Sequence, residues 1–159
     1  MKIWHWLIIG TLIVVIGFFI VKKMKISKLV KDFKVRPQDG YGSGKFGSSR
    51  DGGKRKHEGV DLLVSENQPI FAPTNLNFVR TSQPYKDDKN LTGGVWKDSD
   101  GNELKIFYMK PNTSKKIFNE GEIIGYAQNV SKKYGSSMKN HIHVEYRINN
   151  KLQNPEKYV

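Results

Sequence analysis

The histidines of this chain gather in two short motifs. Three of the four lie in His57-Glu58-Gly59-Val60-Asp61 and His141-Ile142-His143, whereas His5 lies in an apolar run near the start of the chain. Alternate residues of a strand share one face, so His141 and His143 would have Cα atoms roughly 7 Å apart and could reach one small site. Either motif alone is common on ordinary surfaces. The hypothesis of a metal site gains support because both motifs together hold every histidine outside the N-terminal run.

The first motif needs a change of chain direction to serve the same site. In a straight strand, His57 and Asp61 would be about 13 Å apart, whereas zinc binds its ligands at about 2 Å. The segment is therefore either helical or bent. Gly59 suits a bend, and the apolar alternation over residues 60–64 favours a strand after it. Two imidazoles and one carboxylate suit zinc, and three protein ligands with an open fourth position are typical of a catalytic site.

The chain after the first motif reads as a series of short strands. Apolar segments alternate with turn residues at Ile70-Phe71, Leu76 to Arg80, Val95-Trp96, Leu104 to Tyr108, Ile123 to Ala127 and Ile142 to Ile148. Asp100-Gly101 is a good hairpin signal, and no long helical pattern appears among these segments. The sequence therefore predicts a mainly β domain with an antiparallel sheet. Two longer polar loops, 85–92 and 131–140, are expected to rim the site, with Tyr85, Tyr134, Ser136 and Ser137 as candidate peptide contacts.

The N-terminus predicts a membrane anchor. Trp4 to Val21 is an almost unbroken apolar run, just long enough for one transmembrane helix, and lysines follow it directly. A signal peptide has a shorter apolar core and a small-residue cleavage site. We therefore expect an anchor over residues 1–25, a basic linker over 26–39 and one domain over 40–159. The chain contains no cysteine, so it has neither disulfides nor thiolate ligands.

From about Gly40 to Glu145 the chain resembles the lysostaphin or LytM-like zinc metallopeptidases, which cut peptide cross-links in bacterial cell walls. The segments that resemble family motifs are Phe46-Gly47 with Arg50, His57 to Leu62, Pro69 to Pro73, Gly121 to Gly125, and His141 to Glu145. The middle of the chain is similar to the chemotaxin branch of this superfamily at Gln83-Pro84-Tyr85 and Phe107 to Pro111.

The resemblance implies a ligand set and a function. Carried over position by position, it implies that His57, Asp61 and His143 bind Zn2+ and that His141 is the nearby base. The implied fold is an antiparallel LytM-like domain. The implied function is a membrane-anchored peptidoglycan endopeptidase, in which the metal would polarise the scissile carbonyl.

One position departs from the family pattern. Active members carry a further histidine in a Y-x-H segment, whereas this chain reads Tyr108-Met109-Lys110 there. Lys110 could stabilise an oxyanion, with Tyr108 in support, but it could act as a base only if burial lowered its pKa. The resemblance to the chemotaxin branch, which shares this lysine, implies binding rather than cleavage. Two hypotheses therefore stay open: an active endopeptidase, and a zinc-binding relative that holds an envelope peptide or protein. A third hypothesis is a plain basic β domain with incidental histidines.

The charge pattern bears on partners and on orientation. The formal net charge is +12, and six lysines between residues 22 and 34 follow the apolar run. These lysines could lie against anionic lipid head groups. By the positive-inside rule the domain would be cytoplasmic, but the cell-wall substrate that the resemblance implies favours an extracytoplasmic, single-pass arrangement. The chain has no recognised nucleic-acid motif, so we expect no nucleic-acid partner.

Overall fold

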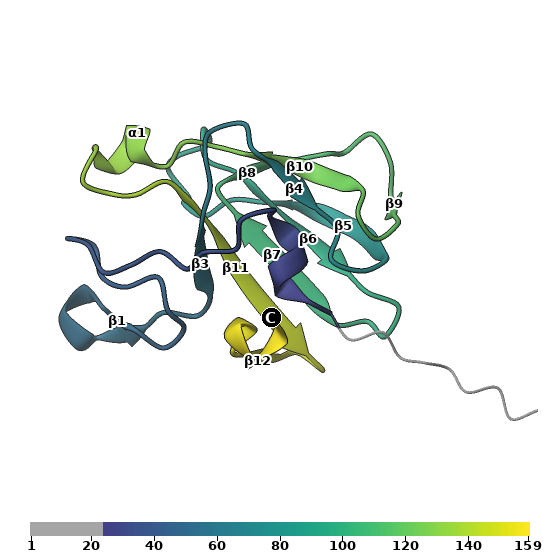
Figure 1. The fold of residues 1–159 in the computed structure, drawn as a ribbon, viewed down its shortest axis with the longest axis horizontal. Helices are drawn as coiled ribbons and strands as arrows, with labels where there is room; N and C mark the ends of the chain where they lie inside the picture. Colours follow the sequence, from purple (N-terminus) through teal and green to yellow (C-terminus); the bar gives the residue numbers. More distant parts are fainter. Residues whose placement is uncertain (1–23) are drawn as a thin grey trace, which may run out of the picture.

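The computed structural model describes residues 24–159. The apolar run Trp4 to Val21, predicted as a transmembrane helix, lies outside the described residues. Within residues 24–159, each helix is too short or too polar to cross a bilayer. The predicted mainly β, antiparallel architecture is confirmed: the described chain forms two main antiparallel sheets and a small hairpin, with only short helices (Figure 1).

The larger sheet contains seven strands, and β11 lies next to the edge that β3 and β12 form (Figure 1). On one edge β11 pairs with β3 and β12, and on the other it pairs with β7, all antiparallel. From β7 the sheet continues through β6 and β5 to β9. The strands are β3 (Val60–Leu63), β5 (Leu76–Ser82), β6 (Gly93–Lys97), β7 (Glu103–Phe107), β9 (Ile117–Phe118), β11 (His141–Ile148) and β12 (Lys151–Gln153).

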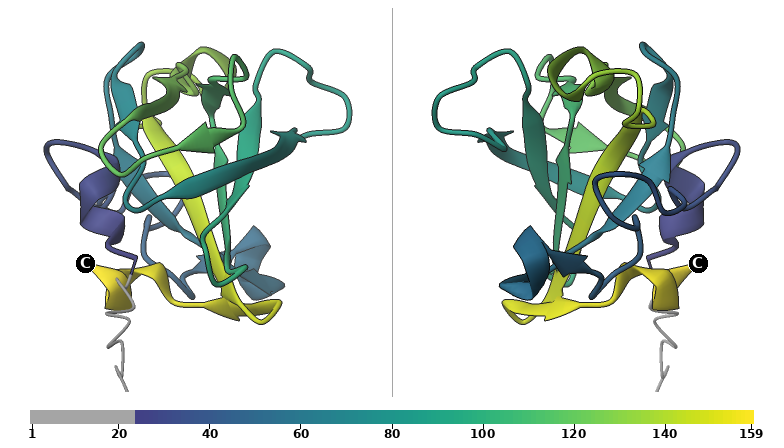
Figure 2. Two further views of the ribbon diagram at one scale, coloured as in Figure 1. Left: turned by 90° about the vertical axis from the view of Figure 1, so that its right-hand side faces the viewer. Right: turned by 90° about the vertical axis from the view of Figure 1, so that its left-hand side faces the viewer.

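A three-stranded sheet packs beside it (Figure 2). Its strands lie in the order β4, β10, β8. Its strands are β4 (Pro69–Phe71), β8 (Met109–Pro111) and β10 (Ile123–Ala127), and the separate hairpin is β1 (Ser49–Arg50) with β2 (Arg55–Lys56). The short helices are η1 (Ile26–Leu29), η2 (Asp51–Gly53), α1 (Ser131–Tyr134) and η3 (Pro155–Tyr158). The predicted hairpin signal is confirmed, because Gly101 lies in the turn between the paired strands β6 and β7.

One apolar core joins the two sheets. Trp96, Leu104 and Ile106 enter it from the larger sheet, and Ile70 and Ile124 enter it from the smaller one. Along β11, Ile142, Val144 and Tyr146 also face this core, which leaves the alternate residues for the opposite face. The apolar half of β11 therefore fixes the strand, and the polar half is presented to the functional site.

The segment predicted as a linker, residues 26–39, packs against the domain. Ile26 and Leu29 of η1 are fully buried in the core, and η1 contacts β4 and η3. The C-terminal η3 and the start of the described chain consequently lie side by side (Figures 1 and 2). Val35 then forms a β-bridge with Leu62. The apolar residues between the lysines account for this packing, since they have a core surface to cover.

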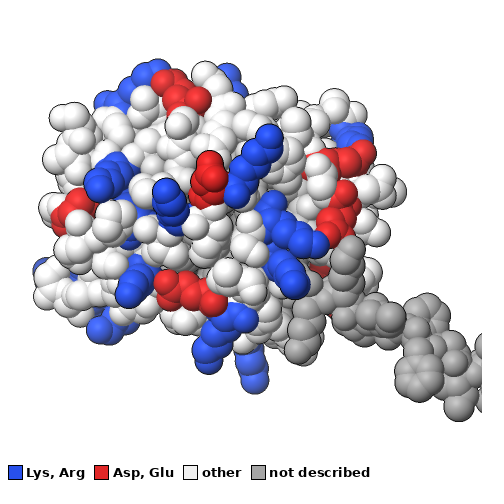
Figure 3. Space-filling model, in the orientation of Figure 1, with Lys and Arg blue, Asp and Glu red and all other residues white. Residues whose placement is uncertain are grey.

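Charged residues of both signs are mixed on one face of the domain (Figure 3). On the face shown in Figure 3, lysine and arginine side chains lie among acidic ones, as a scattered mixture rather than a single stripe.

Candidate metal centre

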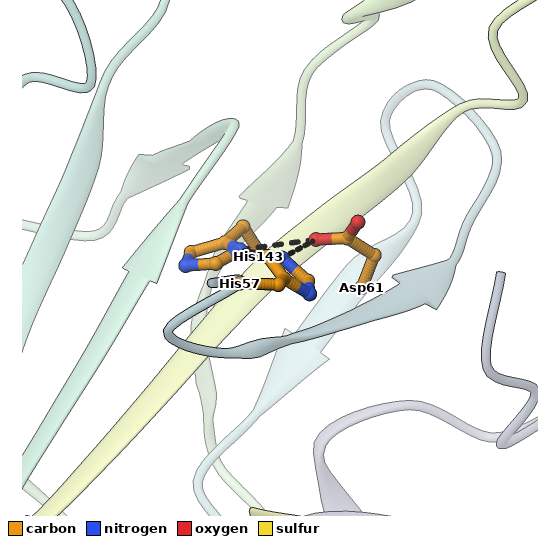
Figure 4. Close-up of side chains that lie close together, drawn as sticks. All are labelled: His57, Asp61 and His143. Atoms are coloured by element: carbon orange, nitrogen blue, oxygen red, sulfur yellow. Dashed lines mark hydrogen bonds and ion pairs between the residues drawn. The ribbon is translucent and has the colours of Figure 1, made fainter. Parts of the chain in front are cut away.

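Three side chains from separate segments converge on one point. His57 follows β2, Asp61 lies in β3 and His143 lies in β11, and all three point toward one another (Figure 4). His57 Nε2 lies 3.1 Å from Asp61 Oδ1 and 3.0 Å from His143 Nδ1. Asp61 Oδ1 and His143 Nδ1 are also 3.0 Å apart. The described chain therefore brings together the two imidazoles and the carboxylate predicted to share a metal.

Strand register explains how Asp61 and His143 meet. In the antiparallel pair of β3 and β11, Asp61 is directly opposite His143. His57 reaches the same point because the chain bends between His57 and Val60, which confirms a bend rather than a helix. A Cβ on Gly59 would lie 2.4 Å from the Val144 carbonyl oxygen and 2.7 Å from His143 Cε1. Gly59 is therefore needed because the backbone passes close to His143, and not for a left-handed conformation.

The outer contacts of the two imidazoles direct their free nitrogens inward. His57 Nδ1 lies 2.9 Å from the Lys45 carbonyl oxygen, which can only accept, so Nδ1 carries the proton and Nε2 presents a lone pair. His143 Nε2 faces Glu145 Oε1 at 3.6 Å. Glu145 is itself held by Lys105 and Arg147, each at 2.7 Å. Burial alone would lower the pKa of His143, but Asp61 at Nδ1 and Glu145 at Nε2 raise it, so a metal ion at Nδ1 would take the place of a proton held there.

Asp61 divides its two oxygens between different partners. Oδ1 faces the imidazoles, whereas Oδ2 accepts from Arg36 Nη2 at 3.0 Å and Nε at 3.3 Å. Arg50 Nη2 is 3.5 Å from the same Oδ2. Burial alone would raise the pKa of Asp61, but the imidazoles of His143 and His57 hold this pKa well below the ordinary value of a carboxylic acid. Asp61 is thus an ionised ligand candidate at neutral pH.

His141 lies beside the three converging side chains. Its Nδ1 donates to the Lys139 carbonyl oxygen at 2.8 Å, and its Nε2 lies 3.9 Å from Asp61 Oδ1. Burial lowers the pKa of His141, which favours the neutral imidazole with a lone pair on Nε2. The side chain is therefore suited to accept a proton next to the metal position, as the resemblance implied.

An open cleft of about 690 Å3 lies over these residues. One part of its lining is aromatic, with Tyr85, Tyr108 and Tyr134, and another part is basic, with Arg50 and Arg55. The Tyr85 hydroxyl lies 2.7 Å from that of Tyr108 and also hydrogen-bonds to that of Tyr134. Tyr85 and Tyr134 thus rim the site as expected from the sequence.

Tyr108 packs edge-on against His141, with ring centroids 5.3 Å apart. Burial raises the pKa of Tyr108 to about 12 and also raises that of Tyr85, so both phenols stay protonated at neutral pH. The other two loop residues proposed as peptide contacts, Ser136 and Ser137, are exposed on the loop after α1.

Lys110 lies elsewhere. It is exposed on β8 opposite Tyr126, and it lines a second cleft of about 380 Å3 with Glu66 and Asp88. The cause is Tyr108, whose φ of +62° ends the extended conformation between β7 and β8. The chain there leaves the larger sheet for the smaller one, so Tyr108 contacts His141 and Lys110 turns away. The structure therefore places Lys110 in a different cleft from the three converging side chains.

Sequence reasoning missed Arg36. Its side chain is 2% exposed and contacts Asp61 directly, although it lies in the segment predicted as a linker. A lone arginine after a run of lysines gives no sequence signal for such a contact, because the pairing joins residues far apart in the chain.

The chain is similar in sequence and in fold to several known proteins. No family model matches the chain. The chain is 31% identical over 126 residues to leukocyte cell-derived chemotaxin-2 of Bos taurus, a match that covers 79% of this chain and 80% of the bovine protein. A solved structure of a zinc-containing peptidase from Vibrio cholerae superposes with a TM-score of 0.59 at 16% identity. That match covers 84% of this chain but only 39% of the longer peptidase.

The catalytic domain of lysostaphin, an antimicrobial peptidase from Staphylococcus simulans, superposes over nearly its whole length. The TM-score is 0.52 at 22% identity, with 79% of this chain and 98% of the lysostaphin domain covered. At these identities the two solved structures establish a shared fold.

Proposed function

We propose that this chain, which belongs to the leukocyte cell-derived chemotaxin-2 family, is a zinc-dependent hydrolase of cell-wall peptide. Its fold is that of the LytM-like peptidases. The observation that carries the proposal is the position of His141. A neutral, oriented imidazole stands beside a converging His, Asp and His donor set, under a cleft open to a peptide.

The donor set fits a zinc ion. In their neutral tautomers, His57 Nε2 and His143 Nδ1 present lone pairs to each other and to the Asp61 carboxylate at about 3 Å. Such an arrangement is repulsive unless a cation or additional protons lie among the three atoms. Nitrogen and carboxylate oxygen ligands in this number are those of catalytic zinc sites. When bound, zinc would supply a Lewis acid for the scissile carbonyl and would lower the pKa of water.

The chain's own residues would carry out the remaining tasks. His141 Nε2 would accept a proton from the attacking water, and the hydrogen bond from Nδ1 to Lys139 would keep the imidazole in the correct orientation. Tyr108 would donate a hydrogen bond from its protonated hydroxyl toward a developing negative charge. The aromatic part of the cleft would exclude water around the bound peptide.

The proposal includes an anchored, extracytoplasmic setting. The apolar run Trp4 to Val21 supports a single-pass anchor, and cell-wall peptide lies outside the membrane. The lysines that follow the run support contact with anionic lipid head groups. The described domain begins a few residues after this run, so the domain would stay close to the membrane surface.

A second function is favoured by one specific observation. The position at which active relatives carry another histidine holds Lys110, which lines a different cleft. With His141 as its single base, the site could bind zinc and a peptide and not turn the peptide over. The protein would then be a zinc-dependent module that holds an envelope peptide or protein.

The deciding experiment uses the full chain purified in detergent and loaded with zinc. We expect release of new amino groups from purified peptidoglycan, together with one zinc per chain. Asp61→Asn should lose both, since it removes the ligand charge but keeps the size of the side chain beside Arg36. His141→Gln should keep the zinc and lose the hydrolysis. Zinc bound by the wild-type chain with no amino-group release would reject the hydrolase and favour the binding module.

A further inference from the structure

We propose that Arg36 is a positioning residue of the metal site, and that the segment linking the N-terminal run to the domain is thereby part of that site. The inference rests on the metal-binding part of the proposed function. It concerns how Asp61 is held, and it is independent of whether a peptide is cleaved.

The backbone of this segment extends the sheet at the metal site. The Leu63 amide donates to the Lys34 carbonyl at 2.8 Å, and the Arg36 amide donates to the Asp61 carbonyl at 2.8 Å. Between these two bonds, Val35 and Leu62 form an antiparallel bridge. Residues 34–36 therefore act as a short additional strand along β3, with Arg36 facing the ligand Asp61.

Gly44 holds this arrangement from the other side. The Gly44 amide donates to the Arg36 carbonyl at 3.0 Å, and the Asp61 amide donates to the Gly44 carbonyl at 2.8 Å. A Cβ on Gly44 would lie 2.7 Å from Arg36 Cβ and 3.0 Å from Asp61 Cβ. Main-chain contacts thus hold Arg36 and Asp61 next to each other independently of the contact between their side chains.

The side chains complete the arrangement. Arg36 reaches Asp61 Oδ2 through both Nη2 and Nε, and its Nη1 is taken up by Asp39. Both donors converge on the one oxygen Oδ2, and the rigid guanidinium therefore holds this oxygen from two directions, which a single ammonium group cannot do. With Oδ2 held in this way, Oδ1 is directed at His57 and His143.

Arg50 cannot replace this contact. It also approaches Asp61 Oδ2, but at 3.5 Å, and its guanidinium donates to the Ser43 carbonyl at 2.7 Å and to the Ser49 carbonyl at 3.2 Å. These two carbonyls direct the guanidinium away from Asp61, and its approach to Oδ2 is longer than either contact of Arg36, so Arg50 contributes positive charge near Asp61 more than orientation. Arg36 is the residue that orients the ligand.

The test compares zinc affinity in full-length variants by competition with a chelating dye. Arg36→Lys keeps the charge and loses the fork, and we expect it to weaken zinc binding by about 10- to 100-fold, as is typical when an outer partner of a metal ligand is replaced. Arg80→Lys is the matched control, because Arg80 is exposed on β5 and donates only to the neighbouring Thr81 carbonyl. Asp39→Asn, which disturbs Arg36 from its far end, should weaken binding by a smaller factor and guards against a folding defect in the first variant.

A second readout needs no metal. In metal-free protein with 15N-labelled histidine, Arg36→Lys should shift the ring nitrogens of His57 and His143, since Asp61 Oδ1 is no longer held against them. Arg80→Lys should leave these signals in place.

The possible outcomes distinguish the role of Arg36 from the presence of a zinc site. Zinc affinity within twofold of wild type in Arg36→Lys, with unchanged ring nitrogens, would overturn the role of Arg36 and leave the metal site standing. If the wild-type chain binds no zinc, the proposed function fails, and the nitrogen signals alone decide whether Arg36 orients Asp61.

Discussion

His57 and His143 are separated by 86 positions in the chain, and their ring nitrogens Nε2 and Nδ1 lie 3.0 Å apart. The unfolded chain does not hold these two groups together, so the site exists only in the folded state. A ligand that requires both groups must therefore favour folding.

Zinc should stabilise the folded protein. At a free zinc concentration about 100 times the dissociation constant, linkage predicts a gain of about 2.7 kcal/mol, which is roughly 10 °C in Tm for a domain of this size. Thermal unfolding before and after removal of zinc with a chelator measures the gain. Magnesium is the control, because it prefers oxygen ligands in octahedral geometry. Equal Tm values with and without zinc would argue against a His, Asp and His site.

A histidine introduced at position 108 and one introduced at position 110 should have different effects on peptide hydrolysis. Lys110→His should leave peptide hydrolysis unchanged, because Lys110 lines the second cleft. Tyr108→His should place an imidazole next to His141 that can donate a hydrogen bond in place of the phenol and also transfer a proton, and it should raise hydrolysis, since a well-placed acid or base contributes about 100-fold or more. Amino-group release from peptidoglycan measures both. An increase for Lys110→His instead would mean that the strand after Tyr108 turns the other way in the working enzyme.

The sequence predicted the faces of the site strand but not the path of the chain around Tyr108. Alternation with period two assigns His141 and His143 to one face and Ile142 and Val144 to the core, and the structure confirms this division. Tyr108 adopts a φ of +62°, a left-handed conformation that the sequence does not indicate because the residue is not a glycine. Its conformation is set by the transfer of the chain between two sheets, which is a tertiary effect beyond the reach of local pattern.

The contact of Arg36 with Asp61 likewise depends on pairing between distant parts of the chain. The ligand candidates could be found because histidine is rare in the chain and three of its four histidines lie in two short motifs, one of which also contains Asp61. An arginine in a lysine-rich stretch has no such signature, and its buried contact with Asp61 appears only when residues 34–36 align with β3. The packing of Ile26 and Leu29 was missed for a related reason, since two apolar residues among lysines are too few to define a pattern.

Tyr146 should make the stability of the protein fall in alkaline solution. Burial raises the pKa of Tyr146 from 10 to about 12, so the unfolded chain releases this proton at lower pH than the folded one. The stabilisation is complete below about pH 10 and is lost as the pH rises toward about 12, by at most about 1.4 kcal/mol per pH unit for one group. Urea unfolding across this range should show a shallower decline in Tyr146→Phe.

The control for the alkaline prediction is Tyr126→Phe. The Tyr126 side chain is 47% exposed on β10, whereas Tyr146 is 3% exposed and packs edge-on against Tyr158. Tyr126→Phe should therefore keep the wild-type slope. An identical slope in all three proteins would mean that the phenol of Tyr146 ionises equally well in the folded and unfolded chains.

Gly59→Ala should damage the metal site through contact alone. The added Cβ would lie 2.4 Å from the Val144 carbonyl oxygen and 2.7 Å from His143 Nε2, so β3 and β11 must separate or the imidazole must turn. We expect weaker zinc binding together with a loss of roughly 1–3 kcal/mol in the free energy of unfolding, the usual cost of overpacking. Gly101→Ala is a suitable comparison, because a Cβ there meets open space and only the φ of +80° is unfavourable. It should lower stability and leave zinc affinity unchanged. If Gly59→Ala binds zinc as tightly as wild type, the close approach of this glycine to His143 does not shape the site.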